Sequence, residues 1–223
     1  RAEKQRLIKE GKIKKDKHES VIFRRDNSHY EKCGSEEICI DDDIPFEIPE
    51  NWSWCRLNEL CTKIGAGSTP TGGKAIYVPE GIKFIRSQNV YNDGLKLNDI
   101  AYITEEINAK KMGSIVRPKD ILLNITGGSI GRCAIVPDDF DIANVNQHVM
   151  IIRLVEPNTR HWIHTILISE YIQNLIMDVQ VGVSREGLSA TKLMNFLIPV
   201  PPICEQNRIL EFCSNISNRL SAL

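Results

Sequence analysis

The chain has 223 residues, 42% of them hydrophobic, and a formal net charge of −1 at pH 7. A chain of this size can bury one substantial core. It has no run close to the ~18 apolar residues of a membrane span, and its charged N-terminus predicts no signal peptide. The near-zero charge excludes a basic field over the whole protein, so any nucleic-acid surface must be a local patch.

The N-terminal segment, 1–17, is basic, with eight Lys or Arg and three acidic residues. Its first ten residues predict a helix that stops at Gly11, and a basic arm follows. Residues 18–43 are polar and acidic with little periodicity, which predicts an extended acidic linker. Because the first residue is an arginine and not a methionine, we expect a fragment of a longer protein.

The main folded domain is expected to span residues 44–200. Residues 52–60 predict a strand that runs into a short helix, and residues 65–74 form a long glycine-rich loop. Residues 82–85 are apolar and predict a further strand, which ends in a polar stretch.

The middle of the chain carries a helix and a pair of strands. Thr104 is the predicted N-cap of the helix, with Ile107 and Met112 facing inward. Residues 121–126 and 130–136 predict two strands joined by a tight glycine turn.

The last part of the domain mixes both element types. Residues 145–155 predict a strand, and residues 160–179 predict one amphipathic helix. A short capped helix at 189–196 and a closing strand from Leu197 complete the domain. Because strands and helices alternate irregularly, we expect an α+β fold with a mixed sheet and flanking helical segments.

The C-terminal segment, 201–223, begins with a proline-rich stop that can continue neither strand nor helix. Beyond it the apolar positions are spaced 4, 3, 4 and 3, which is the spacing of a coiled-coil seam. This seam consists of Ile209, Cys213, Ile216, Leu220 and Leu223. With fewer than three heptads, an ordinary packed terminal helix remains an equal alternative.

The cysteines do not form a recognisable metal or disulfide pattern. There are seven, an odd number, and none forms a Cys-x-x-Cys pair. This usage indicates reduced thiols in a cytoplasmic protein.

Sequence signatures of catalysis are missing. The P-loop pattern fails, because Ser68 replaces its first glycine and Ala75 replaces the Ser or Thr that holds magnesium. The only Pro-Pro lies between Val200 and Ile203, so it lacks the polar and aromatic neighbours of an amino-methyltransferase pocket. The five histidines lack carboxylates at metal-ligand spacing. We therefore expect no catalytic residue, no metal and no cofactor in this chain.

Recognition remains as a function, because Arg, Lys, Asn and Gln offer the paired donors and acceptors that read base edges. Such residues recur at the predicted strand ends, in loops 65–75, 86–93, 127–132 and 182–187. Ordinary turn polarity explains any single one of them equally well. The candidate DNA-binding residues are Ser68, Thr69, Thr71, Lys74, Arg86, Ser87, Gln88, Asn89, Ser129, Arg132, Asn144, Asn146, Gln147 and Arg185.

Three segments resemble the specificity subunits of type I restriction-modification systems. Residues 201–209 read PPICEQNRI and are similar to the element that closes a target recognition domain and opens a spacer helix. Residues 44–60, IPFEIPENWSWCRLNEL, resemble the entry to that domain. The third match is DILLNITGGSIGRCAIVP at 120–137 with ANVNQHV at 143–149. Residues 1–15 also resemble the exit of the central spacer helix.

This resemblance implies a target recognition domain that reads one half of a split duplex DNA sequence, between parts of two coiled-coil-type spacer helices. It implies partners, namely methylation and restriction subunits, which would carry S-adenosylmethionine, ATP and magnesium. Self-association through the C-terminal helix is a further expectation. Two alternatives stay open: the recognition domain of a DNA adenine methyltransferase with its catalytic half elsewhere, and an interaction module that does not bind DNA.

Overall fold

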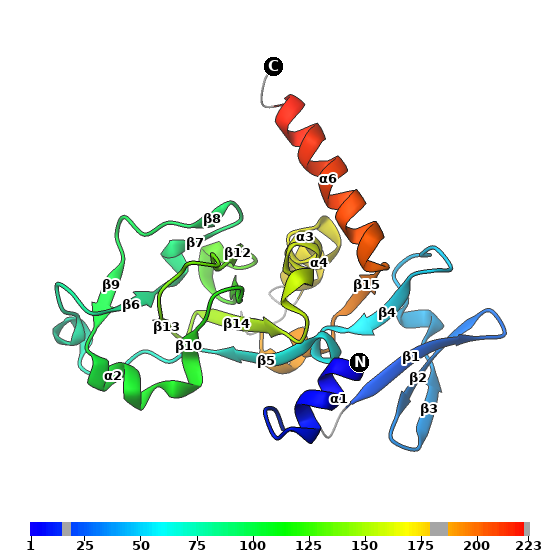
Figure 1. Ribbon diagram of the computed structural model, residues 1–223, viewed down its shortest axis with the longest axis horizontal. Coiled ribbons are helices and arrows are strands. Elements are labelled where there is room, and N and C mark those ends of the chain that lie inside the picture. The colour runs from blue at the N-terminus through cyan, green and yellow to red at the C-terminus, as the bar shows by residue number, and fades with distance from the viewer. Residues whose placement is uncertain (15–18, 179–186, 221–223) are drawn as a thin grey trace. The chain divides into compact units, whose positions relative to one another are not determined.

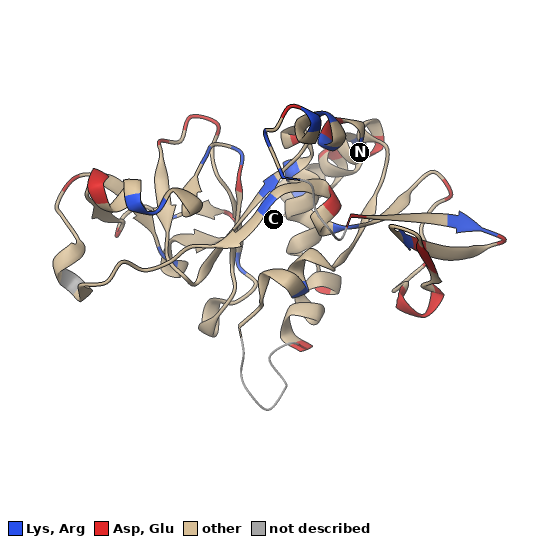
Figure 2. Ribbon diagram, turned by 90° about the horizontal axis from the view of Figure 1, so that it is seen from below, with Lys and Arg blue, Asp and Glu red and all other residues tan. Residues whose placement is uncertain are grey.

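The computed structural model describes residues 1–14, 19–178 and 187–220, and for Lys74 the backbone only. It has an α+β fold with several small sheets and a C-terminal helix (Figure 1). The contacts divide the chain into two units. One unit comprises Arg1–Leu60 with Asn195–Leu223, and the other is Cys61–Met194. Figure 2 marks the basic and acidic residues, and both kinds occur in each unit.

The first unit contains a three-stranded antiparallel sheet where the sequence predicted a linker. Its strands are β1 (Ser20–Arg25), β2 (Ser28–Cys33) and β3 (Glu36–Cys39). The prediction of an extended linker over 18–43 was therefore wrong. The turn between β1 and β2 is Asp26-Asn27, with φ of 51° and 64°. Asp and Asn tolerate this left-handed conformation, and two such residues make the tight turn that hairpins prefer.

The predicted N-terminal helix is confirmed as α1 (Ala2–Lys9), which is followed by Gly11 at φ 69°. Lys4 on this helix is only 4% exposed. Its Nζ donates to the carbonyl oxygen of Asn58 at 2.9 Å and lies 3.3 Å from Oε2 of Glu59. A buried ammonium needs such partners, because removing an unpaired charge from water is costly.

The rest of this unit is a strand pair with a helix at its end. Strand β4 (Ser53–Arg56) pairs antiparallel with β15 (Leu197–Val200). The 3₁₀ turn η1 (Asp41–Asp43) precedes β4 and η2 (Leu57–Leu60) follows it, and the Leu57 N–H donates to the Phe196 carbonyl at 2.9 Å. Both strands and the short helix agree with the sequence prediction.

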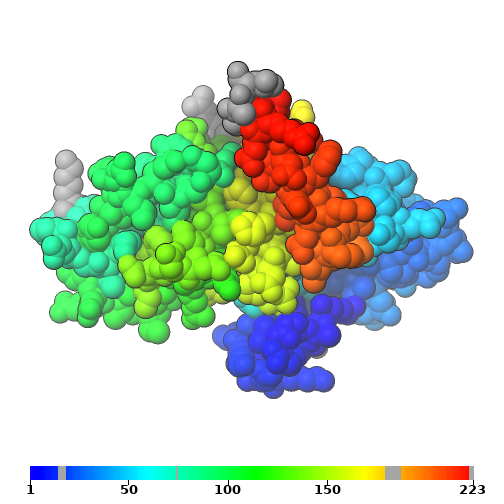
Figure 3. All heavy atoms as spheres, turned by 45° about the horizontal axis from the view of Figure 1, so that its top comes forward, coloured from blue at the N-terminus to red at the C-terminus, as the bar shows by residue number. Residues whose placement is uncertain are grey.

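Helix α6 (Ile203–Leu220) ends the described chain and lies at the surface, orange to red in Figure 3. Its second half, from Glu211 to Leu220, is exposed throughout. The large apolar side chains there include Phe212, Ile216 and Leu220, which are 65%, 43% and 66% exposed. Of the predicted seam, Leu223 lies outside the described residues.

The second unit is built on two four-stranded sheets. The first is antiparallel, in the order β12 (Cys133–Ile135), β11 (Ile121–Asn124), β14 (Val149–Leu154) and β5 (Cys61–Ala66). The second is mixed, in the order β10 (Ile115–Val116), β13 (Ala143–Val145), β6 (Ile82–Ile85) and β9 (Ala101–Ile103), because β13 runs parallel to β6. A small hairpin pairs β7 (Val90–Tyr91) with β8 (Gly94–Leu95).

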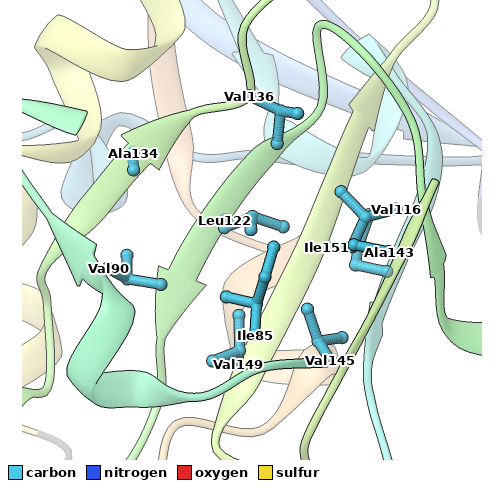
Figure 4. Close-up of a cluster of buried hydrophobic side chains, with 10 residues drawn as sticks. All are labelled: Ile85, Val90, Val116, Leu122, Ala134, Val136, Ala143, Val145, Val149 and Ile151. Atoms are coloured by element: carbon cyan, nitrogen blue, oxygen red, sulfur yellow. The ribbon is translucent and has the colours of Figure 1, made fainter. Parts of the chain in front are cut away.

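The core of this unit lies between the two sheets (Figure 4). It joins side chains of both sheets and of the β7 hairpin, all of them fully buried. The cluster consists of Ile85, Val90, Val116, Leu122, Ala134, Val136, Ala143, Val145, Val149 and Ile151.

The predicted Thr104 cap and the predicted capped helix at 189–196 are both confirmed. Thr104 Oγ1 accepts from the Ile107 N–H at the start of α2 (Glu105–Lys110). Ser189 Oγ accepts from the Lys192 N–H at the start of α5 (Ala190–Met194). The inward orientation of Met112 was wrong, since it is 74% exposed.

Several predicted elements are divided in the structure. The helix predicted over 160–179 is two helices, α3 (Arg160–Leu167) and α4 (Glu170–Asp178), separated where Ser169 Oγ bonds the Ile166 carbonyl. The strand predicted over 145–155 is interrupted between β13 and β14. Short 3₁₀ turns complete the unit: η3 (Gly73–Ile76), η4 (Ser87–Asn89), η5 (Met112–Ser114), η6 (Gly127–Ser129) and η7 (Pro157–Thr159).

Candidate nucleic-acid interface

Three polar loops meet at one edge of the antiparallel sheet. Residue Ala66, at the end of β5, pairs with Met150, at the start of β14. Asn124, at the end of β11, pairs with Val149 on the other side of the same strand. Because neighbouring strands run in opposite directions, the loops 67–72, 125–132 and 146–148 all leave the sheet at this edge.

A chain of side-chain hydrogen bonds joins these three loops. The Thr69 hydroxyl donates to Oε1 of Gln147. The Gln147 amide nitrogen lies 3.0 Å from Nε2 of His148, and Nδ1 of His148 lies 2.6 Å from the Thr126 hydroxyl. An amide nitrogen only donates, so Nε2 accepts and the imidazole proton sits on Nδ1. The exposed Gln147 is thus held directly by loop 67–72 and, through His148, by loop 125–132.

Gly67 explains how closely loop 67–72 approaches loop 146–148. A Cβ atom at this position would overlap the carbonyl oxygens of Val145 and Asn146. Any other residue would therefore push the two loops apart. Asn146 itself is buried and its Oδ1 accepts from the His148 N–H at 3.1 Å, so it shapes the turn that presents Gln147.

A stacked guanidinium lies at the same end of the unit. The Arg132 guanidinium carbon is 4.6 Å from the centroid of the Tyr91 ring, on the β7–β8 hairpin. Arg132 forms no ion pair with any described residue. Stacking orients the guanidinium and leaves its donors available. The sequence predicted Arg132 but missed Tyr91, because a stacking partner from another loop leaves no local pattern.

Loop 86–93 holds two further candidates around one carboxylate. Arg86 Nη2 donates to the Asp99 carbonyl at 2.9 Å and lies 3.5 Å from Oδ2 of its carboxylate. The Gln88 amide donates to the same Oδ2 at 2.6 Å. Both side chains are anchored by Asp99, and Gln88 is exposed.

Besides Asn146, two further predicted base readers are buried structural residues, which corrects the sequence interpretation for all three. Asn89 is 2% exposed, accepts from the Arg86 N–H and donates to the Lys96 carbonyl. Asn144 is fully buried and bonds Ser114, Asn108 and the Lys111 carbonyl. Their amides are satisfied inside the unit, so neither can present an edge to a base.

The remaining candidates are less constrained. Ser68 is exposed and accepts from Lys111 Nζ at 2.7 Å, and Thr71 is exposed. Ser129 Oγ accepts from the buried Asn124 amide at 3.1 Å. The Ser87 carbonyl accepts from the same amide at 2.8 Å, which ties η4 to this loop. The Lys74 side chain and Arg185 lie outside what the structure describes.

The side chains at this edge carry hydrogen-bonding groups. The exposed groups are amides, hydroxyls and a guanidinium, which donate and accept hydrogen bonds. In the described part of the chain, no three His, Cys, Asp or Glu side chains are grouped to hold a metal ion. No helix there has the length and apolar content for a bilayer span.

Comparison with known proteins identifies the family. A family model described as "Type I restriction modification DNA specificity domain" matches residues 49–223. The chain belongs to this family. The resemblance found in the sequence is therefore confirmed.

Two curated relatives come from Escherichia coli. The type I restriction enzyme EcoBI specificity subunit is 30% identical over 176 residues, which covers 76% of this chain and 35% of that protein. The EcoAI specificity subunit is 24% identical over 213 residues, covering 93% of this chain and 32% of the relative. The chain thus spans about a third of the length of these relatives.

Solved structures confirm the fold. The HsdS subunit from Thermoanaerobacter tengcongensis superposes with a TM-score of 0.61 at 21% identity, covering 80% of this chain and 40% of that chain. A chain from a structure titled for complex assembly and conformational transition of the type I R-M system gives a TM-score of 0.60 at 20% identity. The match covers 80% of this chain and 41% of that chain. These matches extend to the mixed α+β arrangement with its C-terminal helix.

Proposed function

We propose that this chain is a target recognition domain, near residues 44–200, that reads one half of a bipartite duplex DNA sequence. It would act as a non-catalytic part of a type I specificity subunit. The observation that carries this proposal is the edge where loops 67–72, 125–132 and 146–148 hold Gln147 in a fixed orientation. Base-contacting side chains that are held by a rigid sheet are well suited to reading a groove of duplex DNA.

Gln147 is the best placed base reader. An amide oxygen has two lone pairs and an amide nitrogen has two hydrogens. Thr69 and His148 use one of each, so the other lone pair and the other hydrogen remain for a base. This pair of groups matches N6 and N7 of adenine in the major groove. Arg132, stacked on Tyr91, offers paired donors that match O6 and N7 of guanine.

The chemistry of methylation and cleavage would lie on partner subunits. We place S-adenosylmethionine on methylation subunits and ATP and magnesium on restriction subunits, in a cytoplasmic complex. An adenine must leave the base stack to be methylated, so the recognition domain would hold DNA that a neighbouring subunit distorts.

The exposed seam of α6 would pack against a spacer helix, from a methylation subunit, another part of the same protein or a second copy. Its apolar positions Ile209, Cys213, Ile216 and Leu220 follow the required spacing. An apolar helix face in water is unfavourable unless a partner covers it.

Selection of binders from random duplex DNA tests the proposal, with the chain mixed with its methylation subunit. Recovery of one short motif that contains an adenine would support it. A Gln147→Ala variant should then lose preference at one position of the motif, whereas Asn89→Ala should not. Binding without a motif, or association that does not weaken with salt, would contradict a sequence reader, because DNA contacts release counterions.

A further inference from the structure

A basic segment lies alongside β5 and reaches loop 67–72 at one end. The segment runs from Lys111 to Arg117. Lys63 on β5 donates to the Gly113 carbonyl at 2.6 Å. Arg153 on β14 donates to the Ile115 carbonyl at 3.0 Å. Lys111 donates to the Ser68 hydroxyl at 2.7 Å, so the segment is tied to the sheet along its length.

Two of these cations face each other directly. Arg153 and Lys63 are partners in the antiparallel register of β14 and β5. Like charges at such a position destabilise a sheet. Asp120, 1% exposed, neutralises Arg153 with two hydrogen bonds of 2.7 and 2.8 Å. Lys63 forms no ion pair with a carboxylate of the described residues.

The surroundings of Lys63 disfavour its positive charge. Partial burial lowers the pKa of this ammonium, and the nearby Arg153 and Arg117 lower it further, while Asp120 acts in the opposite direction. A group in this position gains from an added negative charge, since an anion nearby favours the protonated amine.

Arg117 continues the basic surface at the far end of the segment. Its guanidinium is exposed and forms no ion pair with a described residue. Arg117, Lys119, Asp120 and Arg153 line a cavity of about 150 Å³. Lys119 has a φ of 71°, a left-handed conformation that costs energy in a residue with a long side chain. Lys119 lies 3.8 Å from the Asp138 carboxylate, so Arg117 is the cation of this turn that has no ion pair among the described residues.

We propose that Lys63, Lys111 and Arg117 form a phosphate-binding track for the backbone of duplex DNA. The track rests on the proposed function and adds to it, because it gives the domain a sequence-independent grip on the DNA. Phosphate contacts commonly fix register while base contacts set specificity. The alternative is that these cations only tether the segment to the sheet. Arg117 distinguishes phosphate binding from tethering, because its guanidinium bonds no described group.

The test measures DNA affinity of the full chain against salt concentration. The variants are Lys63→Gln, Lys111→Gln, Arg117→Gln and the triple variant, with Lys192→Gln on α5 as the matched control. The probe is a duplex that carries the motif from the selection, or random duplex if no motif is recovered. Each lost phosphate contact should reduce the slope of log K against log salt by about 0.9. The triple variant should lose about three times this amount, with the base preference unchanged.

The outcomes separate the two proposals. An unsubstituted chain that binds no duplex DNA overturns the proposed function and the track with it. Binding by the unsubstituted chain with an unchanged slope for Arg117→Gln overturns the track alone. An equal loss for Lys192→Gln would show a net-charge effect and also overturn it. Thermal unfolding of each variant reveals whether Lys63→Gln or Lys111→Gln has released the segment from the sheet. If either has, the salt slope of Arg117→Gln alone decides whether the track exists.

Discussion

Gln147 donates its side-chain N–H to Nε2 of His148 at 3.0 Å, which places the imidazole proton on Nδ1, beside Thr126. The orientation of the proposed base reader is therefore set by residues of two other loops. Thr69 fixes the amide oxygen in the same way. Under the proposed function, Gln147 would therefore lose little conformational entropy on contact with a base.

Replacement of Thr126 by valine tests this orientation. Valine keeps the shape of threonine but removes the hydroxyl that His148 contacts. We expect Thr126→Val to weaken the preference at the position read by Gln147, and Gln147→Ala to abolish it at about 1–3 kcal/mol. Relative affinities for the motif and its single-base variants measure both. A uniform loss for all sequences would instead assign Gln147 to the DNA backbone.

Asn144 is expected to matter for stability and not for recognition. Its amide nitrogen faces the oxygen of Asn108 and the Lys111 carbonyl, both at 3.0 Å. Asn144→Asp places a carboxylate against these acceptors, and we expect a loss of roughly 3 kcal/mol or more in unfolding free energy. Urea unfolding measures the loss. Thr71→Ala, at an exposed position, serves as the control and should leave the midpoint unchanged.

The buried ion pair between Lys4 and Glu59 gives a second stability prediction. Their side chains are 5% and 10% exposed. Glu59→Ala leaves the ammonium buried without its carboxylate, which is expected to cost about 3–5 kcal/mol. The double variant Lys4→Met with Glu59→Leu should recover most of this loss, because it removes both charges. A double variant as unstable as Glu59→Ala would show that the pair is not the cause.

The lowered pKa of Glu31 predicts that the protein loses stability in acid. Burial raises the pKa of this carboxyl, but hydrogen bonds from Arg56 and Ser20 and the charge of Arg56 outweigh it, and the net shift is downward from 4.5. A lowered folded pKa adds stability above the unfolded pKa, which is lost as pH falls through the folded value. The unfolding midpoint of the unsubstituted chain should therefore fall as pH drops below 4.5.

The control for this acid effect is Glu31→Gln. This variant should be less stable at neutral pH and should show a smaller change with pH, because the titrating group is gone. Arg56→Gln should flatten the same pH profile, since Arg56 supplies both a positive charge and a hydrogen bond, with Nη2 2.7 Å from Oε2 of Glu31. An unaltered profile in both variants would assign the acid sensitivity to other carboxylates.

The C-terminal helix is expected to act in assembly. Ile216→Glu and Leu220→Glu alter exposed side chains that contact little within the described chain, so thermal stability should change by less than about 0.5 kcal/mol. Association with a methylation subunit, measured by sedimentation, should weaken. Asn218→Glu adds the same charge beside the seam and should not affect it. Intact assembly in all three variants would favour an ordinary exposed helix end.

Short-range patterns predicted much of the fold. Thr104 was recognised as a helix cap, residues 189–196 as a short capped helix and residues 82–85 as a strand, because each signal lies within a few residues. The division at Ser169 was missed, because the apolar stripe continues across it. The β1–β2 hairpin was missed because acidic composition outweighed the turn signal of Asp26-Asn27.

The candidate site was less predictable, because its properties arise from contacts between distant segments. Gln147 and Arg132 were found by residue type alone. Asn144 has the same type as a reader, yet the surrounding side chains bury it, and no local pattern reveals this. Lys63 was missed for the opposite reason, since its missing carboxylate is evident only once β14 and the Lys111–Arg117 segment lie beside it.

The pairing of β4 with β15 has a consequence for how such a protein can change. The chain leaves this strand pair after Leu60 and returns to it at Asn195, and the Leu57–Phe196 hydrogen bond closes the gap. Residues 61–194 therefore form an insertion in the first unit, and the two residues where the chain leaves and re-enters that unit, Leu60 and Asn195, lie on the same strand pair or directly beside it. A different insertion, of another length or another reading edge, can replace it while α1, β4, β15 and α6 keep their own contacts. Under the proposed function, a new specificity would then need the exchange of only one continuous stretch of gene, without new machinery for assembly.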